Sequence, residues 1–151
     1  MASINWVYKS FFELTNLELY AILQLRNDVF VLEQACLYQD ADGKDKNCYH
    51  LSAIDEEKNL IAYCRILPPG LSYTEASIGR VLTAGTQRKM GMGKELMERA
   101  IETTMLQFKC NAIRISAQEY LLGFYQNLGF KPVGNSYLED NIPHIEMLFT
   151  R

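Results

Sequence analysis

Residues 76–108 constrain the fold more than any other part of this sequence, because a strand pattern leads through a glycine-containing loop into a long amphipathic helix. The strand pattern consists of apolar and β-branched residues: Ile78, Val81, Leu82 and Thr83. After the loop, residues that are small, apolar or threonine recur with the helical period on one face, at positions 93, 96, 97, 100, 101, 104, 105 and 108. The pattern predicts a strand, a loop over 84–90 and a helix over 93–108.

The start of this helix is a predicted anion site. The first turn of a helix has backbone N–H groups without intrahelical partners, and the helix dipole adds a partial positive charge there. Gly91 and Gly93 allow a ligand to approach the backbone closely, and Arg88, Lys89 and Lys94 add formal positive charge. Phosphate is therefore the expected ligand.

The spacing of the glycines distinguishes between kinds of phosphate loop. A Walker loop has a longer interval between its glycines than the single residue between Gly91 and Gly93. A dinucleotide-binding loop has a third glycine where this chain has Leu96. The arrangement Arg88-x-x-Gly91-x-Gly93 after a strand resembles instead the pyrophosphate-binding motif of the GCN5-related N-acetyltransferases (GNAT). The alternative interpretation is a helix start with two chance glycines.

Composition argues against several other classes of protein. The chain has 151 residues and a net charge of −3, so we expect one domain over 1–151 and no nucleic-acid partner. No apolar run has the length of a membrane span, and the first residues do not resemble a signal peptide. The four cysteines form no C-x-x-C pair, so we expect no metal site and a reduced, cytoplasmic protein: Cys36, Cys48, Cys64 and Cys110.

The capping box Thr15-Asn-Leu-Glu18 predicts a helix that begins near residue 17 and ends near residue 30. Arg26 and Glu33 lie on its apolar side, where they either point into a site or pair with other charges. The following loop, over 38–47, is long and acidic, as binding loops and solvated surface loops both are. Asp40, Asp42 and Asp45 resemble a calcium loop, but the glycine is misplaced and no glutamate follows at the required spacing, so we expect no calcium there.

The other predicted elements are mainly strands. They are a strand over 3–11, a hairpin of strands over 50–54 and 60–67, a strand over 111–117, a short helix over 119–128, and strands over 130–133 and 144–149 that flank a turn-rich segment over 135–143. Because the long helix lies between two strands, those strands are predicted to pair in parallel with a right-handed crossover.

A second motif extends the resemblance to the whole chain. The segment Phe124-Tyr-Gln-Asn-Leu-Gly-Phe130 is similar to the aromatic-Tyr-x-x-x-Gly-Phe segment after the fifth strand of the family. Within the family, three segments most resemble the ElaA-type subgroup: Arg26–Gln34, His50-Leu51 and Arg65–Pro68. The resemblance implies the GNAT acyl-CoA N-acyltransferase fold. This fold is of the α/β (α+β) class, with a mixed, mostly antiparallel central sheet of about six to seven strands flanked by helices.

The resemblance also implies acetyl-CoA as co-substrate, without a metal. Backbone N–H groups between Lys89 and Lys94 are expected to bind the pyrophosphate, and Val81–Thr83 to pair with the pantetheine arm as an added strand. An amide of that strand would polarise the thioester carbonyl. The residues expected to bind the coenzyme are Val81, Leu82, Thr83, Arg88, Lys89, Met90, Gly91, Met92, Gly93, Lys94, Gln118 and Tyr125.

Tyr125 is also expected to be catalytic, as a hydrogen-bond donor or general acid beside the coenzyme sulfur, although it could instead be an aromatic packing residue. In some relatives a glutamate of the fourth strand removes the proton of the amine, but here that strand has Arg80. The candidate bases are Glu33, His50, His144 and Glu146. Glu33 is the preferred carboxylate and His144 the preferred histidine, while the alternative for either histidine is a structural role.

The predicted function is transfer of an acetyl group from acetyl-CoA to a primary amine of a small molecule or peptide, by direct attack in a ternary complex. The acidic loop over 38–47 hints at a cationic amine. One alternative is a coenzyme A-binding sensor or interaction module without catalysis, because the fourth strand lacks a carboxylate. Another is an acyl-homoserine-lactone synthase, because Arg-x-x-Val-Phe also occurs in those longer proteins. Homodimers are frequent in the family.

Overall fold

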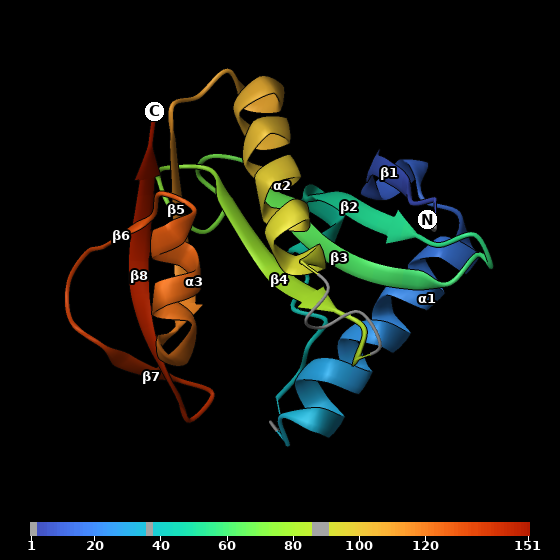
Figure 1. Ribbon diagram of the computed structural model, residues 1–151, viewed down its shortest axis with the longest axis horizontal. Coiled ribbons are helices and arrows are strands. Elements are labelled where there is room, and N and C mark those ends of the chain that lie inside the picture. The colour runs from blue at the N-terminus through green and yellow to red at the C-terminus, as the bar shows by residue number, and fades with distance from the viewer. Residues whose placement is uncertain (1–2, 36–37, 86–90) are drawn as a thin grey trace.

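The computed structural model describes residues 3–35, 38–85 and 91–151, and its first sheet contains antiparallel strands in sequence order (Figure 1). These strands are β1 (Asn5–Ser10), β2 (Tyr49–Ile54), β3 (Leu60–Leu67) and β4 (Ser77–Thr83). Strands β2 and β3 are buried along most of their length, because helices pack against the sheet. The predicted hairpin and the strand that follows it are therefore confirmed.

Helix α1 (Asn16–Arg26) begins at the predicted capping box. The Glu18 amide donates to the Thr15 hydroxyl at 3.1 Å, and the Thr15 amide donates to the Glu18 carboxylate at 2.8 Å. Both bonds satisfy amides that a helix start leaves without partners. The helix then continues as a wider π-helical segment, Asn27–Glu33, so the predicted helix over 17–30 contains two kinds of helical turn.

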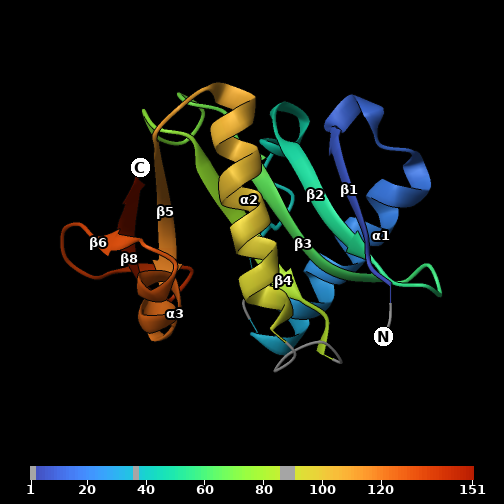
Figure 2. The ribbon, with the colours of Figure 1, turned by 45° about the horizontal axis from the view of Figure 1, so that its top comes forward.

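Helix α2 (Met92–Phe108) packs across β3 and β4 with the face that the sequence predicts (Figure 2). Its buried residues are Met92, Leu96, Met97, Ala100, Ile101, Thr104 and Met105. Thr104 is polar but satisfied, because its hydroxyl donates to the Ala100 carbonyl at 2.6 Å. The helical period alone was sufficient to predict this contact surface.

The second sheet is built around β8 (Ile142–Thr150). It pairs antiparallel with β5 (Ala112–Gln118), β6 (Lys131–Pro132) and β7 (Tyr137–Glu139). Helix α3 (Leu122–Asn127) follows β5, and Gly129 ends it with a φ of 104°, as expected for a glycine after a helix. Short 3₁₀ turns occupy Phe11–Glu13, Asp45–Asn47 and Glu119–Leu121. Strand β7 lies in the segment that the sequence predicted only as turn-rich.

Among the described residues, the two sheets are joined between β4 and β5 over a single parallel bridge from Ala76 to Ile113. The Arg114 amide donates to the Ala76 carbonyl at 3.0 Å, and from there the strands diverge (Figures 1 and 2). The predicted parallel pair is therefore limited to one end. The predicted class, mixed and mostly antiparallel α/β, is confirmed. Within the described ranges, no helix has the length and hydropathy that a bilayer-spanning segment needs.

Candidate active site

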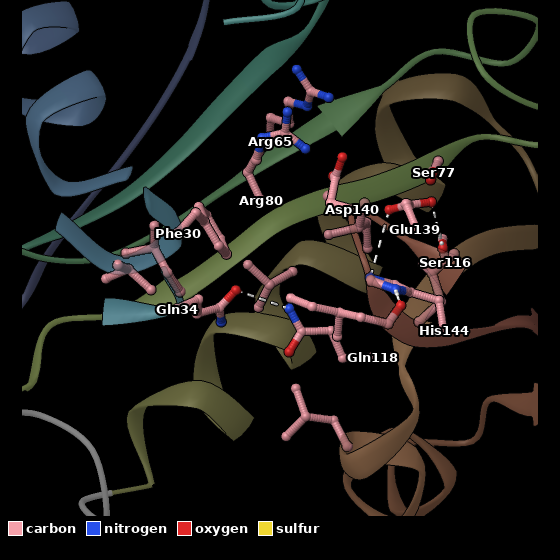
Figure 3. Close-up of a pocket in the computed structure, with 18 of the residues that line it drawn as sticks. Phe30, Gln34, Arg65, Ser77, Arg80, Ser116, Gln118, Glu139, Asp140 and His144 are labelled. Carbon is pink, nitrogen blue, oxygen red and sulfur yellow. Dashed lines mark hydrogen bonds and ion pairs between the residues drawn. The ribbon is translucent and has the colours of Figure 1, made fainter. Parts of the chain in front are cut away.

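A cavity of about 770 Å³ is bounded by residues of the diverging strands β4 and β5 (Figure 3). The π-helical segment, α3, β8 and the loop before β4 also contribute to its lining. Seven of the predicted site residues line this one space: Glu33, Val81, Leu82, Thr83, Gln118, Tyr125 and His144. The tertiary fold thus brings together residues from five separate elements.

The described part of the predicted pyrophosphate loop, residues 91–94, is not part of this cavity lining. Gly91 precedes α2 in a left-handed conformation with a φ of 74°, which favours glycine. The first hydrogen bond of the helix runs from the Glu95 amide to the Gly91 carbonyl at 3.1 Å. The amides of Met92, Gly93 and Lys94 therefore belong to the first turn, which has no intrahelical acceptors. Arg88, Lys89 and Met90 lie outside the described residues.

Strand β4 carries a β-bulge on the cavity wall. Tyr63 of β3 is opposite Leu82 and Arg65 is opposite Gly79, so that two residues, Arg80 and Val81, correspond to one on β3. A bulge interrupts the ladder and leaves the extra residue without a regular partner. Arg80 has a φ of 50°, an unfavourable conformation for a residue with a Cβ, and both bulge residues line the cavity.

The acidic loop is held by buried arginines. The Arg26 side chain is almost fully buried, and it donates to Asp40 and Asp45, each at 2.8 Å. Arg65 is 4% exposed and donates to Asp42 at 2.6 Å and to Asp45 at 2.9 Å. Burial opposes ionisation of these aspartates, but hydrogen bonds and charge from the arginines outweigh it, so the pKa values of Asp42 and Asp45 are lowered.

The same network reaches the bulge, where Arg80 donates through Nε to Asp40 at 2.7 Å and through Nη2 to the Asp40 carbonyl at 2.9 Å. The aspartates of the 38–47 loop therefore neutralise arginines, and their charge gives no support for a cationic acceptor. Of the two alternatives for Arg26, a charge pair or a site residue, the structure shows the charge pair, with Asp40 and Asp45. Glu33 is exposed and lies on the cavity wall.

Both ring nitrogens of His50 are hydrogen-bonded within the protein, as expected for the structural alternative. Its Nδ1 accepts a hydrogen bond from the Tyr63 hydroxyl at 2.6 Å, which leaves Nε2 to donate to the Asp45 carbonyl at 3.0 Å. Burial lowers the pKa of His50, and the ring is not part of the cavity lining. Glu146 is also outside that lining, and it accepts from Arg114 at 3.1 Å.

His144 does face the cavity. The strand alternation of β8 places it beside Gln118 of β5 and Tyr137 of β7. Its Nδ1 donates to the Ile142 carbonyl at 2.7 Å, so Nε2 carries the lone pair when the ring is neutral. That atom is 3.6 Å from the carboxylate of Glu139 (Figure 3).

Glu139 and Ser116 are polar cavity residues that the sequence interpretation missed. Ser116 donates to Glu139 at 3.2 Å and contacts the Tyr137 hydroxyl. A local signal was present in the sequence, because Asp140-Asn141 is a suitable pair for a type I′ hairpin turn. Both residues have positive φ, and they place Glu139 directly opposite Ile142 in the β7–β8 hairpin.

Tyr125 presents an available hydroxyl to the cavity. Its ring packs edge-on against Phe124 and Phe130, with centroids 5.1 and 5.8 Å away. The hydroxyl has no hydrogen bond to another residue in the described ranges, yet it is not among the fully enclosed polar atoms. Burial raises the pKa of Tyr125, so the phenol keeps its proton. The residue therefore both packs in the core and offers a donor.

The described residues contain no group of three or more His, Cys, Asp or Glu side chains arranged for a metal ion. On the wall between the π-helical segment and β5, the Gln118 amide donates to the Gln34 side chain at 3.2 Å. The space thus contains a phenol donor, an imidazole acceptor, a carboxylate and the bulged backbone of β4.

The family model, the related sequences and the similar crystal structures all indicate the same family. Residues 23–151 match the family described as acetyltransferase (GNAT) domain. Protein ElaA of Escherichia coli is 41% identical over 147 residues, which cover 95% of each chain. Its crystal structure is 38% identical, with a TM-score of 0.90 over 97% of this chain and 99% of that one. The crystal structure of an acyl-CoA N-acyltransferase from Pseudomonas aeruginosa is 41% identical, with a TM-score of 0.93 over 98% and 100%.

Proposed function

Because this chain belongs to the acetyltransferase (GNAT) family and is ElaA-like, we propose that it transfers an acetyl group from acetyl-CoA to a primary amine within a ternary complex. The observation that carries the proposal is the cavity, where a phenol donor, Tyr125, and an imidazole acceptor, His144, line the same space as the β4 bulge. Acyl transfer to an amine needs a donor for the leaving thiolate and an acceptor for the proton of the amine.

In this proposal the coenzyme spans two parts of the structure. Its pyrophosphate lies at the start of α2, where Gly91, Met92, Gly93 and Lys94 present first-turn amides. Its pantetheine arm pairs with the Val81–Thr83 section of β4, beyond the point where β4 leaves β5. The divergence of the strands supports this placement, because none of the described strands pairs in parallel with β4 there and competes for its backbone groups.

The reaction then uses the residues around the bulge. His144 Nε2 takes a proton from the ammonium form of the acceptor, and the amine attacks the thioester carbonyl. A β4 amide at the interrupted ladder stabilises the oxyanion that develops. As the C–N bond forms and the C–S bond breaks, the Tyr125 hydroxyl donates its proton to the sulfur. Burial raises the pKa of Tyr125, so the phenol stays protonated and its hydroxyl is available as a hydrogen-bond donor to the sulfur as charge develops there.

Glu33 is the alternative base on the opposite wall. It ends the π-helical segment and lines the cavity, but it is exposed, whereas His144 is buried and its ring is held by the Ile142 carbonyl. A fixed ring presents its lone pair in one direction, which favours His144. The proposal also places the protein in a reducing compartment such as the cytoplasm, supported by the free thiols of Cys48, Cys64 and Cys110.

The test is turnover of acetyl-CoA by the purified chain with a panel of primary amines, with the acetylated product identified by mass spectrometry. We expect His144→Ala to lower the rate by about 10²–10⁴-fold with unchanged coenzyme affinity, and Glu33→Gln to change it little. Coenzyme binding without any acetylated product would favour the sensor alternative. An active His144→Ala variant together with an inactive Glu33→Gln variant would indicate that Glu33 is the base.

A further inference from the structure

Glu139 and His144 form a close polar pair in the cavity, and the proposed reaction assigns a role to His144 but none to Glu139. The two side chains meet diagonally across the β7–β8 hairpin, with Glu139 Oε2 and His144 Nε2 separated by 3.6 Å. Both line the cavity. Their exposure differs, because the Glu139 side chain is 48% exposed and that of His144 only 9%. The carboxylate thus lies at the rim and the imidazole deeper.

The hydrogen bonds of the pair leave the two facing atoms available. Ser116 donates to Oε1 of Glu139, and Nδ1 of His144 donates to the Ile142 carbonyl. When the imidazole is neutral, a lone pair and an anionic oxygen therefore face each other without a proton between them. Two acceptors at this distance are a site for a group that can donate to both.

From this the geometry points to a binding site for the ammonium group of the acceptor between Glu139 and His144. An ammonium nitrogen about 2.8 Å from each acceptor would form a triangle with the observed 3.6 Å separation as its third side. An ammonium has three N–H donors, enough for both acceptors. The inference rests on the proposed function, and it specifies an acceptor that binds as a cation, with Glu139 as a binding residue.

The charges around the pair are compatible with a cation. The side chains nearby on β5 and β7 are neutral hydroxyls and an amide, from Ser116, Tyr137 and Gln118. Asp140 lines the same region, and Tyr73 contributes a phenol from the loop before β4, with its pKa raised by burial to about 12. The arginines of the cavity wall already pair with the aspartates of the acidic loop.

The proton balance of the step is complete. The bound R–NH₃⁺ gives one proton to His144 Nε2, and the resulting imidazolium forms an ion pair with Glu139. The neutral amine forms the C–N bond, the C–S bond breaks, and the sulfur takes the Tyr125 proton. The amide nitrogen then loses its remaining extra proton, which restores Tyr125, and His144 releases the first proton to solvent.

The experiment compares the wild-type chain with Glu139→Gln and Glu139→Asp. The acceptors are the alkylamine most rapidly acetylated in the panel and hydroxylamine, which is mainly neutral near pH 7.5. We expect Glu139→Gln to raise KM for the alkylamine by about 10–100-fold, because a charge-assisted hydrogen bond is lost. KM for acetyl-CoA and turnover of hydroxylamine should change less than about 3-fold. Glu139→Asp should recover part of the alkylamine affinity.

Glu146→Gln is the matched control, because Glu146 lies on the same face of the sheet and pairs with Arg114, away from the cavity lining. It should leave KM for the alkylamine unchanged. If Glu139→Gln weakened the reaction equally with the alkylamine and with hydroxylamine, the substitution would be damaging the hairpin, and the inference would be overturned. Unchanged KM with the alkylamine would overturn it while leaving the proposed function intact. Absence of turnover by the wild-type chain with any acceptor would overturn both.

Discussion

Replacing Tyr125 by Phe isolates the hydroxyl that the proposed mechanism uses. The ring packs against Phe124 and Phe130, and this packing is retained in the variant. The hydroxyl has no hydrogen-bond partner among the described residues, so its removal leaves no protein group unsatisfied. We therefore expect the free energy of unfolding to change by less than about 0.5 kcal/mol.

The kinetic effect should be much larger than the effect on stability. A positioned acid contributes about 10²–10⁴-fold to the rate, which corresponds to about 2.7–5.5 kcal/mol of activation free energy. The loss should be in kcat, because charge develops on the sulfur only as the C–S bond breaks. Coenzyme affinity should be retained, because the expected pyrophosphate contacts are at the start of α2.

The assay is loss of thioester absorbance under saturating acceptor, which avoids thiol reagents that would react with the free cysteines of this chain. Calorimetric titration with coenzyme A and thermal unfolding complete the comparison. Tyr120→Phe is the control, because Tyr120 also lines the cavity but is 75% exposed. Full activity of Tyr125→Phe would refute the assignment of Tyr125 as the acid and leave it as a packing residue. A large fall in stability would refute the claim that the hydroxyl has no partner.

Two further predictions concern the coenzyme loop and the charge network. Gly91→Asp should abolish measurable coenzyme binding by calorimetry in a folded protein, because a carboxylate would repel the pyrophosphate; unchanged affinity would remove this site. Asp45→Asn should lower the free energy of unfolding by about 3 kcal/mol in urea, because two buried arginines lose a counter-charge, whereas exposed Asp28→Asn should have little effect. The folded-state pKa values of Asp42 and Asp45 are lowered, so the stabilisation that these residues provide is complete above the ordinary aspartate pKa. This stabilisation should be lost as pH falls below about 4, where the free energy of unfolding of the wild-type chain should decrease. A free energy of unfolding that does not change with pH in that range would contradict this prediction.

Elements with a local signal were predictable from the sequence alone. The capping box that begins α1, the buried face of α2 and the left-handed glycine after α3 all depend on residues within a few positions of each other. Helical period, caps and backbone preference act at that range, so the order of elements followed from them, whereas the family resemblance rested on two short motifs, one before α2 and one in α3. The family resemblance placed Tyr125 among the candidates, and the ordinary pKa range of histidine placed His144 there.

Only the tertiary structure decided what those candidates can do. His50 and His144 have similar sequence contexts, yet one is enclosed by Tyr63 and a backbone carbonyl while the other faces the cavity. Arg65 pairs with Asp42, which lies 23 residues earlier in the sequence. Strand alternation does not predict which charged side chains meet over such a separation. The 3.6 Å gap between Glu139 and His144 likewise depends on a two-residue turn and the register of one hairpin. Burial and contact between separate elements are set by the packing of whole sheets and helices, and therefore no local pattern in the chain specifies them.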